Sequence, residues 1–244
     1  IRRQRQMCIR DRQGGFQYKH KVLFRDGSHH GFTFGAMSVS GDPGIRSPIF
    51  ERLVSPIGVV VPSAHPYKCD YCDGACNLGC AKAVESTIQY ENPDTVAAFM
   101  MEPIAKGAII PHPEYWPMID EICKKYGILI IADEVVTGFR TSKSGAQGYF
   151  GITPDMCTMA KILAGGLPGG AVGGKADIIN MIQFRDDEDF NSNTRIPHNG
   201  TYNANPLSAV AGATALGLVA NTPVNDTANA MAGRLKKGLN NMLS

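Results

Sequence analysis

One stretch decides the fold of this 244-residue chain: Ile128-Leu129-Ile130-Ile131-Ala132-Asp133. Its first five residues are all apolar and include three β-branched isoleucines, a composition that favours a β-strand. A strand that is apolar at every position has both faces buried, as in a parallel sheet covered by helices. The stretch therefore predicts a central strand over Ile128–Ala132 that ends at an acidic side chain.

Short apolar runs alternate with helical patterns through the rest of the chain. Further strands are predicted over Lys21–Arg25, Val59–Val61, Thr95–Met101, Met156–Ala160 and Ala171–Gly173. Helices are predicted over Leu78–Tyr90, Glu114–Tyr126 and Pro206–Ala220, and Tyr115 and Trp116 are expected in the core. This alternation predicts an α/β fold, a mostly parallel sheet with helices on both faces.

Three of the predicted strands end at an ionisable residue. Glu102 follows Thr95–Met101, Asp133 follows Ile128–Ala132, and Lys161 follows Met156–Ala160. Open parallel sheets bind ligands beyond the carboxyl ends of their strands. A single polar residue at a strand end would be ordinary loop chemistry, but three together predict a site with two carboxylates and one amine.

The residues around these strand ends form an extended motif. Residues 130–140 read Ile-Ile-Ala-Asp-Glu-Val-Val-Thr-Gly-Phe-Arg, residues 149–155 read Tyr-Phe-Gly-Ile-Thr-Pro-Asp, and residues 159–166 read Met-Ala-Lys-Ile-Leu-Ala-Gly-Gly. Over residues 21–220 the chain resembles the class III aminotransferases. The resemblance implies a fold-type I large domain with a seven-stranded sheet, the cofactor pyridoxal 5'-phosphate, and active sites at a homodimer interface.

The resemblance also implies roles for individual residues. Lys161 resembles the lysine that forms a Schiff base with the cofactor, and Asp133 resembles the acid that pairs with its pyridinium nitrogen. Val135 matches an aliphatic residue that packs on one face of the cofactor ring. In the segment Gly27-Ser28-His29-His30-Gly31, His29 stands where relatives carry Tyr or Phe on the other ring face, ahead of a His-Gly pair.

Further positions match the family or depart from it. Glu102 matches the glutamate on the floor of the site, and Gly200-Thr201 match a segment that reaches the cofactor phosphate of the neighbouring subunit. Val136 and Gly107 replace the Gln and Glu of relatives that act on ornithine or 4-aminobutyrate, which argues against those substrates.

The resemblance indicates an incomplete chain. The family's phosphate-binding loop would precede the residues present, and its C-terminal small domain would follow them. Residues 1–12 are interpreted as a non-native or disordered arm, 13–220 as a partial cofactor-binding domain, and 221–244 as the start of a helix leading to the small domain. By itself this stretch is expected to be inactive.

Cys69, Cys72, Cys76 and Cys80 form a C-x2-C-x3-C-x3-C pattern. Its spacing allows zinc or an iron–sulfur cluster. Tetrathiolate sites usually contain two paired C-x2-C arms, so free thiols without metal are predicted, with Cys80 buried on a helix. A non-catalytic metal-binding or interaction module remains the alternative of another functional class.

The composition argues against two classes of binding partner. The net charge of +2 argues against nucleic acid and against a polybasic membrane patch. Seven cysteines without a secretory signal fit the cytoplasm.

The predicted function is transfer of an amino group from an amino acid or amine to a 2-oxo acid. The alternative within the fold is a glutamate-1-semialdehyde 2,1-aminomutase.

Overall fold

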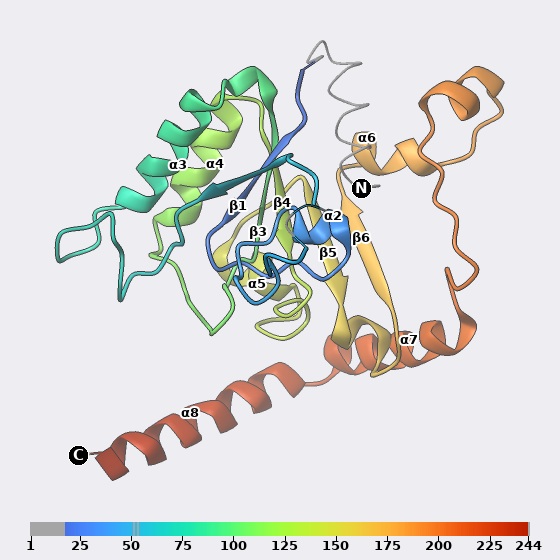
Figure 1. The fold of residues 1–244 in the computed structure, drawn as a ribbon. Helices are drawn as coiled ribbons and strands as arrows, with labels where there is room; N and C mark the ends of the chain where they lie inside the picture. The colour runs from blue at the N-terminus through green and yellow to red at the C-terminus, as the bar shows by residue number, and fades with distance from the viewer. Residues whose placement is uncertain (1–17, 51, 53, 244) are drawn as a thin grey trace.

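The computed structural model describes residues 18–50, 52 and 54–243, and the interpretation of residues 1–12 lies outside them. Figure 1 shows a twisted sheet with helices packed against it and a long helix, α8, that projects from the body. The described strands are β1 (Lys21–Arg25), β2 (Gly58–Val61), β3 (Val96–Met101), β4 (Leu129–Asp133), β5 (Met156–Ala160) and β6 (Gly170–Gly174).

The described helices fall into two groups by length. The longer ones are α3 (Gly79–Tyr90), α4 (Tyr115–Lys125), α7 (Pro206–Asn221) and α8 (Val224–Leu243). The shorter ones are α2 (Phe34–Met37), η2 (Pro93–Thr95), α5 (Gly145–Phe150), η3 (Lys161–Ala164), α6 (Ala176–Ile179), η4 (Asn180–Ile182) and η5 (Phe190–Thr194). Every strand and helix predicted from the sequence is present, with ends that differ by at most one residue.

The sheet has the order β2-β1-β3-β4-β5-β6. The strands from β2 to β5 pair in parallel, and β6 runs antiparallel to β5. Six strands are present in the described residues, where the family resemblance implies seven. The mostly parallel α/β architecture is confirmed.

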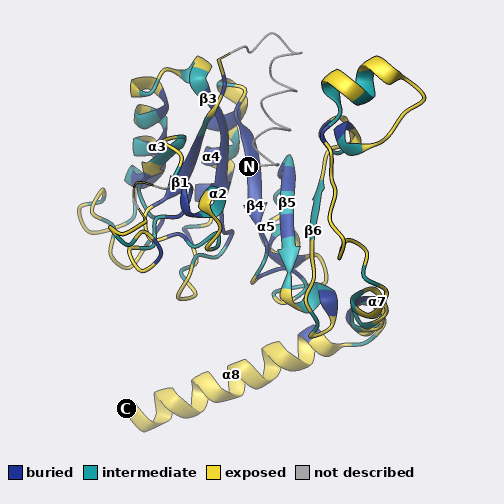
Figure 2. Ribbon diagram, turned by 45° about the vertical axis from the view of Figure 1, so that its right-hand side comes forward, coloured by how far each residue is buried: buried dark blue, intermediate teal, exposed yellow. Residues whose placement is uncertain are grey.

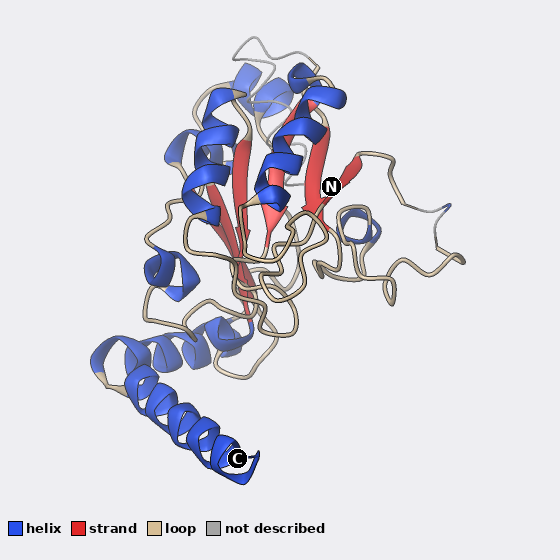
Figure 3. Cartoon of the chain, turned by 90° about the vertical axis from the view of Figure 1, so that its left-hand side faces the viewer, coloured by secondary structure: helices blue, strands red, loops and turns tan. Residues whose placement is uncertain are grey.

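Figure 3 shows the long helices α3 and α4 in front of the strands. On one face α3 and α4 pack through Val84, Ile88 and Ile119 onto strand residues such as Phe99. On the other face Ile178 of α6 and Val39 pack onto a layer that includes Ile131. Strands β3 and β4 are buried along their whole length, which explains their unbroken apolar sequence.

The core contains Tyr115 and Trp116, with exposed fractions of 1% and 3%, as predicted. Helix α8 is exposed along nearly all of its length (Figure 2). Within the described residues, no single helix is long and apolar enough to cross a membrane. The pair α7 and α8 passes that test only when taken together, and these two helices are bent by 73° at their junction.

A test of this core is Ile131→Ala in the purified protein. Ile131 is 2% exposed in the middle of β4, so its removal should leave a cavity and lower the free energy of unfolding by about 2–5 kcal/mol. Urea unfolding measures the change. Leu235→Ala on α8, where the side chain is 66% exposed, is the control and should change stability by about 0.5 kcal/mol or less. Equal effects of the two substitutions would contradict the assignment of β4 to the core.

Candidate active site

The parallel sheet brings the three predicted ionisable residues to neighbouring strand ends. Met101 is in register with Ala132, so Glu102 follows β3 beside the last residue of β4, Asp133. Asp133 is in register with Thr158, three residues before Lys161. Three residues of strand span about 10 Å. Lys161 therefore lies just beyond the carboxyl end of β5, at the same edge of the sheet as Asp133 at the end of β4.

Asp133 is a buried carboxylate whose two oxygens both have partners. One oxygen, Oδ2, lies 2.6 Å from Nδ1 of His30, whose side chain is completely buried. The other, Oδ1, accepts a hydrogen bond from the Thr158 hydroxyl at 3.0 Å and from the Val135 backbone N–H at 3.1 Å. The loop after β1, the turn after β4 and strand β5 therefore all converge on this one acid.

These contacts determine the ionisation of Asp133. Burial raises its pKa, but the hydrogen bond and the charge of His30, together with the Val135 N–H and the Thr158 hydroxyl, outweigh burial. The net result is a lowered pKa, which keeps the carboxyl ionised near neutral pH. An anion held at a sheet edge is suited to pair with a cationic ring nitrogen.

Glu102 is also buried, but its environment acts in the opposite direction. Desolvation raises its pKa, and the nearby Asp133 charge adds to that effect, while His30 and Arg25 oppose it. Its Oε2 has no hydrogen-bond partner within the described residues. Glu102 therefore holds a buried carboxyl oxygen whose hydrogen bonding is incomplete.

Arg25 contacts the backbone of Glu102. Its guanidinium, at the end of β1, is 1% exposed and its Nη2 donates a hydrogen bond to the Glu102 backbone carbonyl. The guanidinium carbon lies 5.9 Å from the centre of the Trp116 ring, so the buried cation also has an aromatic neighbour. Sequence reasoning did not assign Arg25, because a charged residue inside a strand pattern gives no sign of its partners.

Lys161 is exposed and begins η3 directly after β5. Its φ of 51° lies in the left-handed region, which a side chain other than glycine adopts at an energetic cost. Gly165 and Gly166, at φ of 61° and 93°, complete the turn. Backbone strain at a lysine on the strand end that neighbours a buried acid favours a functional position.

The other predicted site residues are placed differently. His29 is partly exposed, with Nδ1 3.6 Å from Asp42 Oδ2, and its ring makes an edge contact with Phe32. Val135 is half-buried beside Asp133. The proposed contacts of His29 and Val135 with a cofactor ring stay predictions.

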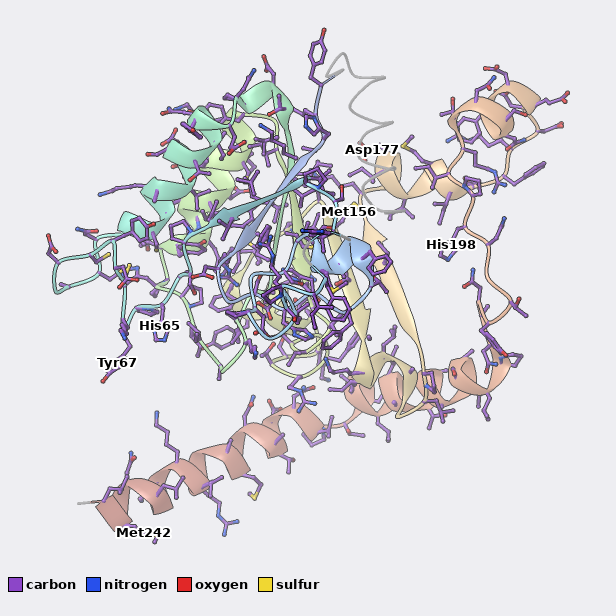
Figure 4. All side chains as sticks on the ribbon, viewed as in Figure 1. His65, Tyr67, Met156, Asp177, His198 and Met242 are labelled. Carbon is purple, nitrogen blue, oxygen red and sulfur yellow. The ribbon has the colours of Figure 1, made fainter. Side chains whose placement is uncertain are left out.

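Gly200 and Thr201 lie apart from the strand-end cluster. They are exposed, in the segment before α7 that runs outside β6, where Figure 4 labels the neighbouring His198. A cavity of about 440 Å³ lies beside this segment and is lined by residues that include His198, Tyr202 and Ala164. The structure therefore does not bring Gly200-Thr201 to the acid of the same chain.

Sequence reasoning missed three residues that build the site: His30, Thr158 and Glu134. His30, rather than its neighbour His29, makes the contact with Asp133. Glu134 is 1% exposed and accepts hydrogen bonds from the Thr137 hydroxyl and from the backbone N–H groups of Ala146 and Gln147. The His-Gly pair at residues 30–31 and the adjacent acids at 133–134 were the available signals.

Comparisons with known proteins agree with this geometry. The family model of the class III aminotransferases matches residues 4–244. A glutamate-1-semialdehyde 2,1-aminomutase of Sulfurisphaera tokodaii is 33% identical over 232 residues, which are 94% of this chain and 50% of that protein. The chain thus spans about half the length of this curated relative.

Solved structures show the same fold. An omega transaminase of Pseudomonas jessenii in complex with PMP superposes with a TM-score of 0.87 at 26% identity, over 99% of this chain and 53% of that one. An amine transaminase of an uncultivated Pseudomonas species, in its PLP-bound form, gives 0.85 at 26% identity, over 98% and 54%.

The sheet topology is that of the fold-type I pyridoxal-phosphate-dependent transferases. Within that class, the chain belongs to the class III aminotransferase family, whose cofactor is pyridoxal phosphate. The family predicted from residues 130–166 is confirmed.

The pairing of Asp133 has a consequence for acid stability. Its pKa is lower in the folded protein than in the unfolded chain, so it stabilises the fold above the ordinary Asp pKa, about 3.9, and this contribution is lost as the pH falls through the folded value. The difference in unfolding free energy between the natural protein and Asp133→Asn should therefore shrink below about pH 4. Urea unfolding at several pH values measures it, and a difference that grows towards acid would contradict the pairing.

Proposed function

We propose that the protein is an aminotransferase in which Lys161 holds pyridoxal phosphate covalently and Asp133 pairs with the ring nitrogen of that cofactor. The observation that carries this proposal is the Asp133–His30 contact of 2.6 Å beside a strand that ends at a lysine with a φ of 51°. A sheet can fold without a paired buried acid and without a strained lysine. Together, the ionised Asp133 and the amine of Lys161 suit the binding of one ligand.

The residues present fit the cofactor. The lowered pKa of Asp133 provides the anion that a protonated pyridine ring requires. Glu102 Oε2 and His30 Nε2 are buried polar atoms that have no partner within the described residues. Buried polar atoms without partners mark a place where a ligand or water completes the hydrogen bonding.

When bound, pyridoxal phosphate supplies an electron sink for reactions at the α-carbon of an amino acid. Asp133 would keep the ring nitrogen protonated, and His30 and Thr158 hold Asp133 ionised and oriented. Lys161 Nζ would carry a proton to and from the substrate carbon. Val135 and His29 would hold the two faces of the ring, and Glu102 would close the floor of the site.

The proposed substrates are an amino acid or amine as donor and a 2-oxo acid as acceptor, and the proposed assembly is a homodimer. The exposed position of Gly200-Thr201 outside β6 supports a contact with the cofactor phosphate of a neighbouring subunit. Cytoplasm is the proposed location, supported by the absence of pairing among the described cysteines.

A second candidate is an aminomutase that moves an amino group within one substrate. The observation that favours it is the 33% identity to the Sulfurisphaera tokodaii enzyme. The two candidates are separated by an assay with glutamate-1-semialdehyde alone. Conversion without any added 2-oxo acid would identify the aminomutase, and a requirement for a separate acceptor would identify the aminotransferase.

Lys161→Ala tests the proposed covalent attachment. In the purified full-length protein with pyridoxal phosphate, this substitution should abolish the visible absorbance of lysine-bound cofactor and lower turnover by several orders of magnitude, because a covalent catalyst is lost. Borohydride reduction followed by mass spectrometry should place the cofactor on Lys161 in the natural protein.

Lys82→Ala, at an exposed position of α3, is the matched control and should leave absorbance and turnover unchanged. Normal turnover by Lys161→Ala, or a cofactor reduced onto a different lysine, would refute the assignment.

A further inference from the structure

The cysteine-rich loop between β2 and α3 forms a second chemical feature. It contains Cys69, Cys72 and Cys76, and Cys80 follows in the first turn of α3. In Figures 1 and 4 the loop lies at the left of the molecule, where His65 and Tyr67 are labelled, on the opposite side of the sheet from β6 and α7. The transaminase site does not use these thiols.

The backbone brings Cys69 and Cys72 together. The Cys72 N–H donates to the Cys69 carbonyl at 3.3 Å, which closes a turn of the chain. A hydrogen-bonded turn keeps its first and fourth Cα atoms within about 7 Å, and a disulfide needs about 4.4–6.8 Å. The Cα spacing of the two residues therefore suits a disulfide.

The loop is held firmly in this shape. A Cβ on Gly79 would lie 1.9 Å from the Tyr71 carbonyl oxygen, so the middle of the loop lies directly against the first residue of α3. The Asn77 side-chain oxygen accepts hydrogen bonds from the Gly79 N–H at 2.9 Å and from the Cys72 thiol at 3.2 Å. Leu78 adopts a φ of 61° to complete the turn into α3.

The Cys72 sulfur lies among other thiols and backbone donors. Electrostatic interactions link Cys72 to Cys69 and Cys76, and link Cys80 to Cys69. The backbone N–H groups of Asn77 and Gly79 also lie near enough to favour the ionised form of Cys72, while the Gly79 N–H donates its hydrogen bond to Asn77 Oδ1. Such donors stabilise a thiolate, which is the reactive form of cysteine.

Three of these thiols differ in acidity. The Asn77 N–H and the other donors lower the pKa of Cys72, although burial opposes them. Burial raises the pKa of Cys69 and raises that of Cys80 to about 12. Cys72 is also partly exposed, whereas Cys80 is buried, so the thiol with the lowered pKa is one that solvent reaches.

A metal centre fits the arrangement less well. Across residues 18–50, 52 and 54–243, no group of three or more His, Cys, Asp or Glu side chains is placed so that it could hold a metal ion. The interactions between thiols are pairwise, with Cys72 at their centre.

We propose that Cys72 and Cys69 form a redox-active dithiol that reacts with a low-molecular-weight disulfide of the glutathione type. The Cys72 thiolate attacks one sulfur of that disulfide, forms a mixed disulfide and releases one thiolate. Cys69 loses its proton to solvent and attacks the Cys72 sulfur, which releases the second thiolate. The protein is oxidised by two electrons to the Cys69–Cys72 disulfide, and the small disulfide is reduced to two thiols.

The first experiment maps the oxidised bond in the natural protein. After treatment with glutathione disulfide and blocking of the remaining thiols, cleavage after Lys68 and Lys82 releases residues 69–82, which contain all four cysteines of the loop. Further cleavage before Asp70 and Asp73 separates Cys69, Cys72 and the Cys76–Cys80 pair unless a disulfide joins them. We expect Cys69 to stay linked to Cys72. Linkage of Cys76 to Cys80, or complete resistance to oxidation, would overturn the proposal.

The second experiment separates the roles of the two thiols. Cys69→Ser removes the resolving thiol, so glutathione should accumulate as a mixed disulfide on Cys72. Cys76→Ser is the matched control, because Cys76 is also partly exposed and interacts with Cys72, and it should still form the Cys69–Cys72 bond. Accumulation of glutathione on Cys76 or Cys80 in the Cys69→Ser protein would contradict the assignment.

Two measurements on the natural protein need no substitution. Iodoacetamide at neutral pH should alkylate Cys72 at least about tenfold faster than Cys80, because only the thiolate reacts. Zinc analysis of protein purified without chelator should give well under one equivalent per chain. One equivalent of tightly bound zinc, with all four thiols protected from alkylation, would replace the dithiol by a metal site.

Discussion

A buried negative charge is stable only when it is fully paired, and Asp133 imposes this requirement on the whole sheet edge. His30, the Thr158 hydroxyl and the Val135 N–H meet at its two oxygens. His30 lies 103 residues earlier in the chain, so the acid connects the loop after β1 to the end of β4. The order β1-β3-β4-β5 makes this possible, because it sets those elements side by side.

The two adjacent acids have different roles because each needs partners for its buried charge. The Glu134 carboxylate accepts hydrogen bonds from Thr137 and from the N–H groups of Ala146 and Gln147, and so stabilises the turn between β4 and α5. Gly145 stands where a Cβ would lie 2.8 Å from the Glu134 carboxylate, which requires a glycine there. With the turn held by Glu134, Asp133 is left to face the ligand edge.

The cysteine loop resembles the Asp133 site in one respect. In both places, neighbouring groups favour the ionised form of a single side chain, the Cys72 thiol in the loop and the Asp133 carboxyl at the sheet edge. The loop lies across the sheet from β6, so its chemistry can operate without the cofactor.

Local pattern alone determined the strands, the helices and the three strand-end residues Glu102, Asp133 and Lys161, because apolar periodicity reports burial directly. The tertiary structure decided which of two adjacent histidines meets Asp133. His29 and His30 have the same side chain, and only the packing of the loop after β1 against β4 buries one of them. It also decided the partners of Arg25 and Glu134, because a hydrogen bond between distant segments depends on how strands are ordered and leaves no trace in either segment's own sequence.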